Sequence, residues 1–168
     1  MSEIIAVYPG SFDPYTKGHH DVVVKACGLF DKVVILVAKN PDKSGLFNAL
    51  ERVGLIKDSL FELEGALPSQ VGVDILENEN MAVRYASSIG ARCLIRSMRA
   101  NTEFEYELAL AFHNEMQEAS VQTIFLPPNI KHQFTSSSAA RKAAQLNGSI
   151  GYMVGPSVEK ALRKKFNK

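Results

Sequence analysis

Short runs of apolar, mostly β-branched residues alternate along the chain with longer segments of helical period. Five such runs predict strands, at residues 4–8, 33–37, 71–75, 93–95 and 123–126. Four of the five are nearly continuous apolar runs, as is typical of parallel strands that are covered on both faces. The pattern therefore favours a buried parallel sheet.

Two helices have readable starts. Asn48, with Glu51 three residues later, predicts one N-terminus, and Thr102 with Glu105 predicts another. Apolar residues then recur at helical spacing in each segment. They are Leu50, Val53, Ile56 and Leu60, expected to form a core-facing stripe, and Phe104, Leu108, Phe112 and Met116 at steps of four.

Four further helices complete the pattern. They are expected to begin near His19 (burying Val22, Val23 and Ala26), near Met81, near Ser137 and after Pro156. This order predicts an α/β fold, namely a Rossmann-like, open, doubly wound five-stranded parallel sheet with helices on both faces and additional C-terminal helices. The length of 168 residues suits one domain over 1–168, without internal repeats or linkers.

Composition narrows the function classes. Nineteen Lys and Arg against eighteen Asp and Glu give a formal net charge of +1, which argues against a dedicated nucleic-acid binder. Cys27 and Cys93 fit no metal-ligand spacing and are expected to be buried free thiols. The N-terminus lacks the features of a signal peptide, and no apolar run reaches membrane-spanning length. We therefore expect a cytoplasmic protein with no nucleic-acid or membrane partner.

Basic residues follow four of the predicted strands. In open α/β sheets, ligands bind beyond the carboxyl ends of the strands, so these residues should share one rim. They are His19, Lys43, Arg96, Arg99, Lys131 and Arg141. In a chain with almost no net charge, such a local positive crevice suits phosphate groups.

Two predicted helix starts strengthen this interpretation, because a helix N-terminus offers free N–H groups to an anion. One begins at Gly18–His19 and the other in the serine run 136–138. Gly10 and Gly18 allow close approach of the backbone, and Arg141 returns to the helix face of Ser138.

The adjacent histidines His19 and His20 cannot both face a phosphate bound at the helix start, because neighbours on a helix point about 100° apart. Spacing alone leaves open which of the two does so. His132, in the loop after the last strand, is a further candidate for ligand contact.

Several phosphate-binding and catalytic motifs are missing from the sequence. It contains no GxxxxGK[ST] loop, no GxGxxG after the first strand, no GxSxG elbow and no Cys/His cluster. The remaining possibility is phosphate chemistry by positioning and charge neutralisation, without a protein nucleophile.

The motifs carry a family resemblance. Residues 16–19 (TKGH) match the (H/T)xGH motif of the nucleotidyltransferase superfamily, and residues 137–141 (SSAAR) resemble its (S/T)(S/T)xxR signature. Together with YPGSFDP at 8–14, RSMR at 96–99, FEYE at 104–107 and FTSSS at 134–138, the chain resembles bacterial phosphopantetheine adenylyltransferases from about residue 4 to 160.

The resemblance implies that ATP and 4′-phosphopantetheine react to dephospho-CoA and pyrophosphate in coenzyme A biosynthesis. His19 occupies the motif position and would stabilise the transition state at the α-phosphorus. Lys43 and Arg96 would also be catalytic. The acceptor would be bound by Ser11, Lys43, Ala82 and Arg96. ATP would be bound by Ser11, Phe12, His19, Ser97, Met98, Arg99, Glu107, His132, Gln133, Phe134, Thr135, Ser136, Ser137 and Ser138.

The resemblance also implies Mg²⁺ carried by ATP with no dedicated protein ligands, a homohexamer, and CoA as a feedback ligand. At three positions the chain departs from the family pattern. Ser97 stands where glycine is usual, Thr135 where isoleucine is common, and His20 where an apolar residue is common.

Two alternatives remain open at this stage. One is a related nucleotidyltransferase with another acceptor, either nicotinamide mononucleotide with ATP or glycerol phosphate with CTP. The other is a non-catalytic nucleotide or CoA sensor that uses the same crevice.

Overall fold

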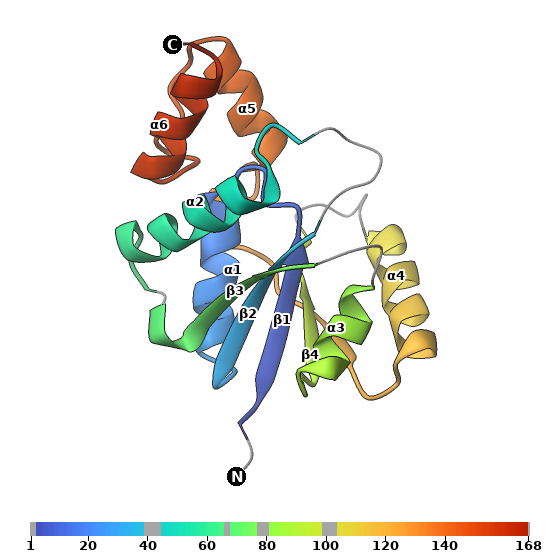
Figure 1. The fold of residues 1–168 in the computed structure, drawn as a ribbon. Helices are drawn as coiled ribbons and strands as arrows, with labels where there is room; N and C mark the ends of the chain where they lie inside the picture. The colour runs from blue at the N-terminus through green and yellow to red at the C-terminus, as the bar shows by residue number, and fades with distance from the viewer. Residues whose placement is uncertain (1–2, 39–44, 66–67, 77–80, 99–103, 168) are drawn as a thin grey trace.

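A five-stranded parallel sheet forms the centre of the computed structural model, which describes residues 3–38, 45–65, 68–76, 81–98 and 104–167. The strand order is β3-β2-β1-β4-β5, with β1 in the middle (Figure 1). The strands are β1 (Ile5–Gly10), β2 (Lys32–Val37), β3 (Val71–Ile75), β4 (Cys93–Arg96) and β5 (Gln122–Phe125). The register aligns Gly10 at the end of β1 with Val37 at the end of β2.

In the described residues, six α-helices and two short 3₁₀ helices connect or follow the strands. The α-helices are α1 (Lys17–Cys27), α2 (Ala49–Glu62), α3 (Ala82–Ser88), α4 (Phe104–Gln117), α5 (Ser137–Gln145) and α6 (Pro156–Lys165). The 3₁₀ helices are η1 (Pro68–Gln70) and η3 (Ile130–His132). This is the predicted doubly wound α/β fold, and its sheet and helix order are confirmed.

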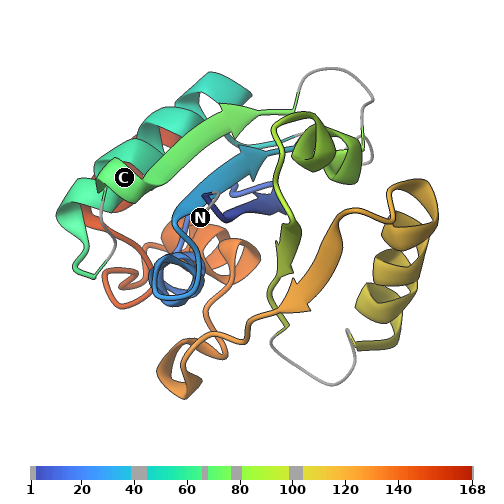
Figure 2. The same cartoon turned by 90° about the horizontal axis from the view of Figure 1, so that it is seen from below.

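The sheet is covered on both faces (Figure 2). On one face, α1 and α2 pack against alternate residues of the central strands, and Val22, Ile35 and Ile56 are fully buried there. On the other face, α3 packs Val83 against Val7 and Leu94. Successive residues of β1 therefore serve opposite cores, which explains why that strand reads as a continuous apolar run.

A separate small core joins the C-terminal helices to α2. Leu55 of α2 packs with Ala140 of α5 and with Val158 and Leu162 of α6. Figure 1 shows α5 and α6 beyond the carboxyl ends of the strands, at the top of the sheet. This arrangement brings the start of α5 to the end of the sheet where ligands bind in such folds.

The helix starts were predicted better than the buried faces. Asn48 caps α2 in the expected capping box with Glu51. Ile56 and Leu60 are buried as predicted, but the expectation for Leu50 is wrong, since this side chain is 75% exposed. The buried face of α2 runs instead through Leu55 and Arg52, because the helix packs on both the sheet and α6.

The apolar stripe of α4 does not enter the core of the chain. No described residue of α4 is buried, and Phe112 and Met116 are strongly exposed. The predicted cap at Thr102 lies outside the described residues.

Cys27 and Cys93 are free thiols, each half-buried. Within the described part of the chain, none of the helices has the length and apolar character needed to cross a membrane.

His20 is a buried structural residue, only 5% exposed. Its Nε2 lies 3.0 Å from the Glu64 carbonyl oxygen, to which it donates, and its Nδ1 lies 3.5 Å from the Tyr15 hydroxyl. Burial lowers the pKa of His20 below its ordinary value of 6.5. The ring is therefore held neutral, and it ties α1 to the end of the α2 segment.

This geometry predicts a pH dependence of stability. The unfolded chain binds a proton at His20 below about pH 6.5, whereas the folded chain binds one only at lower pH, so the free energy of unfolding should decrease as the pH falls through and below about 6.5. One such histidine contributes a slope of at most about 1.4 kcal/mol per pH unit. Urea unfolding between pH 7.5 and 5 should show a smaller slope for His20→Gln, which keeps an N–H donor.

The matched control is His113→Gln, because the His113 side chain lies at the exposed surface of α4 and not in the core of the chain. It should change the slope less than His20→Gln does. Equal slopes for His20→Gln and the wild-type protein would contradict the role given to His20.

Candidate active site

A pocket of about 200 Å³ opens at the carboxyl end of the central strand. It collects residues from β1 through the start of α1, from the end of β4, from α4 and from the connection between β5 and α5. They are Tyr8, Pro9, Gly10, Ser11, Phe12, Gly18, His19, Arg96, Ser97, Glu107, Pro128 and Thr135. The location agrees with the general rule that open α/β sheets bind ligands beyond the carboxyl ends of their strands.

His19 is oriented by the first turn of α1. Thr16 caps the helix, and its Oγ1 accepts a hydrogen bond from the His19 N–H at 3.3 Å. In return, the Thr16 N–H donates to His19 Nδ1 at 3.1 Å. Because Nδ1 is an acceptor in this capping box, the ring proton resides on Nε2. The side chain that lines the pocket is thus a fixed N–H donor, suited to an anionic oxygen.

Aromatic rings fix the plane of the His19 ring. The ring of Phe12 meets it edge-on at a centroid distance of 5.1 Å, and Tyr15 lies 5.7 Å away on a tilted plane. Both aromatic side chains are almost completely buried. Burial raises the pKa of Tyr15 well above its ordinary value, so this phenol stays protonated and structural.

Phe12 itself has left-handed backbone geometry, with φ of 46°. Such a conformation is costly for a bulky residue and persists only where the surroundings enforce it. The residue as a whole is only 2% exposed and belongs to the core cluster, so its ring serves packing.

Arg96 and Glu107 form the charged wall of the pocket. Arg96 Nε and Nη2 donate to the two carboxylate oxygens of Glu107 at 2.6 and 2.7 Å. Burial lowers the pKa of Arg96, but the bonds to Glu107 outweigh burial and raise it overall. The guanidinium is thus held in the pocket by a bidentate ion pair that keeps part of its donor fork for a ligand.

The comparisons with known proteins agree with this geometry. Residues 7–143 match the cytidylyltransferase-like family model. A phosphopantetheine adenylyltransferase of Methylobacillus flagellatus is 40% identical over 166 residues, which cover 99% of both chains. That of Staphylococcus haemolyticus is 39% identical over the full length of both chains. The chain belongs to the phosphopantetheine adenylyltransferase family.

Similarity of fold extends further than similarity of sequence. The nicotinic acid mononucleotide adenylyltransferase of Plasmodium falciparum, solved as a complex with NaAD, superposes with a TM-score of 0.74 over 99% of this chain and 97% of that one. Its sequence identity is only 16%, so this match shows the shared fold alone.

The three departures from the phosphopantetheine adenylyltransferase pattern fit the structure. Ser97 lines the pocket without needing glycine, since the left-handed non-glycine residues of the described chain are Phe12, Asn147 and Asn167. Thr135 is buried, and its N–H donates to the His132 carbonyl at 2.9 Å. His20 is accommodated by its bonds to Glu64 and Tyr15.

The serine run at α5 combines structural roles with a place beside the pocket. Ser136 caps α5 by accepting the Ala139 N–H at 3.0 Å, and Ser137 donates to the Pro14 carbonyl at 2.8 Å. Ser138 lies 3.4 Å from Arg141 Nη2. Of the three hydroxyls, that of Ser137 joins α5 to the β1–α1 connection, while the other two make bonds within α5.

The pocket brings together seven of the predicted site residues: Ser11, Phe12, His19, Arg96, Ser97, Glu107 and Thr135. Other predicted residues lie outside its lining, although the structure describes them. They are Ala82 at the start of α3, Met98 after β4, His132, Gln133 and Phe134 in and after η3, and Ser136, Ser137 and Ser138 at α5. Lys43 and Arg99 fall outside the described residues.

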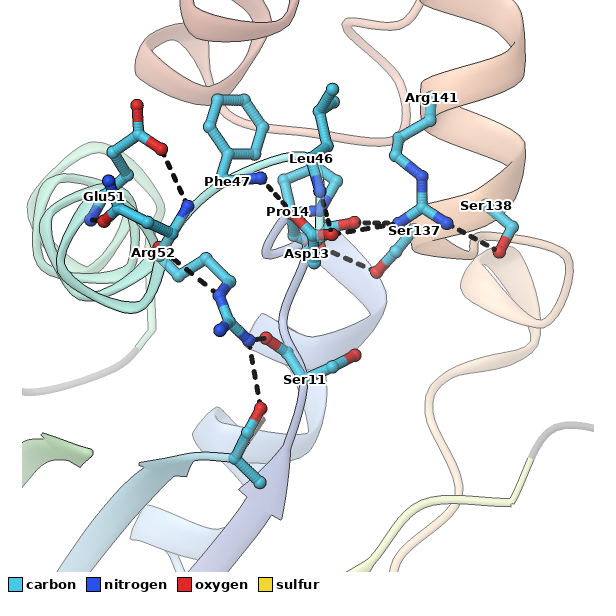
Figure 3. A network of polar contacts seen from close by, with 12 residues as sticks. Ser11, Asp13, Pro14, Leu46, Phe47, Glu51, Arg52, Ser137, Ser138 and Arg141 are labelled. Carbon is cyan, nitrogen blue, oxygen red and sulfur yellow. Dashed lines mark hydrogen bonds and ion pairs between the residues drawn. The ribbon is translucent and has the colours of Figure 1, made fainter. Parts of the chain in front are cut away.

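Sequence reasoning missed the residues that hold the β1–α1 connection in place (Figure 3). Asp13 accepts the N–H groups of Leu46 and Phe47 at 2.8 and 2.9 Å. Arg52 donates to the Ser11 carbonyl at 2.6 Å. Arg141, expected among the free basic residues of the rim, instead donates to the Asp13 carbonyl and pairs with its carboxylate.

Gly10 makes room for a side chain. A Cβ at this position would lie 2.9 Å from Cζ of the Phe12 ring, whereas one at Gly18 would make ordinary contacts. We therefore expect Gly10→Ala to push Phe12 away and to lower the free energy of unfolding by about 1–3 kcal/mol, the usual cost of overpacking. Because Phe12 packs on His19, the His19 ring resonances should move in an NMR spectrum.

Gly54→Ala is the matched control, since a Cβ at this helical position of α2 meets no atom within 4 Å. It should raise stability by about 0.5–1 kcal/mol and leave the His19 resonances in place. A Gly10→Ala protein as stable as the wild type, with unmoved His19 resonances, would show that the Phe12 contact is unimportant.

Proposed function

We propose that this protein transfers the adenylyl group of ATP to 4′-phosphopantetheine, giving dephospho-CoA and pyrophosphate, as the names of its full-length relatives indicate. The observation that carries this proposal is the oriented His19 N–H donor beside Arg96 in a pocket at the carboxyl end of β1. No covalent protein intermediate is needed in this mechanism. The reaction is a step of coenzyme A biosynthesis.

The chemistry follows from the charges of the reactants. A phosphate oxygen of the acceptor is already an anion and attacks the α-phosphorus of ATP directly, without a general base. The new P–O bond forms as the bond from the α-phosphorus to the bridging oxygen breaks, and pyrophosphate leaves with that electron pair. Charge grows on the oxygens around the α-phosphorus, where the Nε2–H of His19 donates.

The two phosphate-bearing substrates divide the pocket between them. We assign the acceptor phosphate to Ser11, Arg96 and Lys43, with Ala82 near the pantetheine arm. Arg96 receives it with the donors that Glu107 leaves available. ATP is assigned to Ser11, to the Phe12 N–H, to His19, to residues 97–99 and Glu107, and to residues 132–138. All of these assignments, for residues inside and outside the pocket lining, are part of the proposal.

Mg²⁺ enters this mechanism with the nucleotide. The carboxylate in the pocket, Glu107, is engaged by Arg96, and the other lining residues offer hydroxyl and imidazole groups. This set does not resemble an oxygen cage for Mg²⁺, which commonly binds nucleotide phosphates and waters. When bound, the ion neutralises charge on the triphosphate.

A cytoplasmic location, the action of the chain as one domain and feedback by CoA stay predictions.

A panel of acceptors and variants tests the proposal. Pyrophosphate release from MgATP should depend on 4′-phosphopantetheine and not on nicotinamide mononucleotide. His19→Ala should lower kcat by about 10²–10³-fold, as expected for the loss of a preorganised donor. The neighbouring variant His20→Gln serves as the matched control and should keep kcat, since His20 faces the core.

Release with nicotinamide mononucleotide alone would favour the related transferase. ATP or CoA binding without any release would favour the sensor. Near wild-type turnover of His19→Ala would refute the role assigned to His19.

We also propose that the chain assembles with itself into a homohexamer, as the family resemblance implies. The exposed apolar face of α4 supports self-association, because Phe112 is 59% and Met116 84% exposed on a helix without buried residues. Contiguous apolar surface of this kind is typical of interfaces.

Light scattering on the wild-type protein should give the mass of six chains. The double variant Phe112→Glu with Met116→Glu should lower this mass, because charges on the face oppose its burial. The control, Phe61→Glu with Leu50→Glu, changes exposed apolar residues of α2 and should keep the assembly. A monomeric wild-type protein, or unchanged assembly of the α4 variant, would contradict this proposal.

A further inference from the structure

Arg52 is a buried cation that binds the backbone of Ser11, a residue of the pocket lining. It lies in the first turn of α2 and is 6% exposed. Its Nη1 donates to the carbonyl oxygens of Ser11 at 2.6 Å and Ala38 at 3.0 Å, and its Nε lies 3.4 Å from the Asn48 carbonyl oxygen (Figure 3). One side chain thus joins the ends of β1 and β2 to the start of α2.

The charge of Arg52 has no direct counter-ion in the described chain. Its partners are carbonyl oxygens, and it forms no ion pair with a described carboxylate. Burial lowers the pKa of Arg52, which the more distant charge of Asp13 partly offsets. Burying an unpaired cation costs free energy. If the role of Arg52 were purely structural, an uncharged donor could satisfy the same carbonyl groups without that cost. A bound polyanion would provide the missing charge.

The bond to Ser11 also fixes the direction of the next N–H group. The peptide between Ser11 and Phe12 is trans, so its carbonyl and its N–H point in opposite directions. Ser11 and Phe12 line the pocket and Arg52 does not, so the N–H of Phe12 is directed away from Arg52, on the pocket side. Within the described chain this N–H has no hydrogen-bond acceptor.

Two effects make that N–H a better anion donor. The guanidinium bonded to the carbonyl polarises the peptide, since hydrogen bonds in a chain strengthen one another. The same bond helps to hold Phe12 in its left-handed conformation, which is unfavourable without such support.

We propose that Arg52 is a positioning residue for adenylyl transfer, which directs and polarises the Phe12 N–H toward the phosphate groups of the nucleotide. This inference rests on the proposed function, which supplies ATP as the substrate. Arg52 does not touch the reactants itself but acts through the peptide between Ser11 and Phe12.

Kinetics of two substitutions distinguish this role from packing. Methionine matches the stem of Arg52 but lacks charge and donors, whereas lysine keeps the charge and can reach toward the same carbonyls. We expect Arg52→Met to lower kcat about 10²-fold, as for loss of one preorganised donor, and Arg52→Lys to restore at least a tenth of the wild-type kcat. If Arg52 only packed α2, methionine would serve at least as well as lysine.

Arg163→Met is the matched control. Arg163 also donates to a carbonyl, that of Gly148 at 2.7 Å, but lies on α6 outside the pocket lining. It should keep kcat and both KM values. Wild-type release of pyrophosphate tests the proposed function separately. In an active wild type, equal kcat for folded Arg52→Met and Arg52→Lys, or wild-type kcat for Arg52→Met, would overturn the role of Arg52.

A measurement on the unchanged protein covers the case in which Arg52→Met does not fold. In amide NMR spectra, addition of MgATP should move the Phe12 proton downfield more than that of Gly54, because a hydrogen bond forms. An unmoved Phe12 signal at saturating MgATP would overturn the inference, even with full activity.

Discussion

The active site depends on how the connection between β1 and α1 is held. This short segment carries a left-handed residue, Phe12, and ends in the turn that orients His19. It is fixed from outside by charged groups, since Arg52 and Arg141 bind its carbonyls and Asp13 binds two N–H groups ahead of α2. Hydrogen bonds to charged groups are stronger than those between neutral groups. Here they enforce a backbone path that the local sequence alone would disfavour.

Such rigidity suits a reaction in which the protein supplies no nucleophile. Phosphoryl and adenylyl transfer are accelerated by alignment and by donors set in advance where charge develops. The capping box gives His19 one ring tautomer, and the aromatic packing gives it one orientation. Arg96 is likewise held by its ion pair with Glu107. The net charge of +1 is therefore compatible with phosphate binding, because the positive charge that matters is local.

The sequence predicted most of the fold because its signals were local. Strand composition, the cap at Asn48 and the motif at His19 lie within a few residues of what they specify. The support of the site was not predicted, because its contacts join residues 33 to 128 positions apart. Leu50 shows a related limit. Helical spacing is compatible with a buried stripe that includes Leu50, but α2 packs against both the sheet and α6, and this packing buries Leu55 instead.

The stereochemical course of the reaction is the most direct test of this account. If the acceptor phosphate attacks the α-phosphorus of ATP in line, with no covalent protein intermediate, a chiral α-thiophosphate analogue of ATP must give the phosphorothioate analogue of dephospho-CoA, with inverted configuration at the transferred phosphorus. Phosphorus NMR of the product distinguishes the two outcomes. We predict inversion. Retention would require two successive displacements and hence a protein nucleophile, which would contradict catalysis by alignment and charge alone.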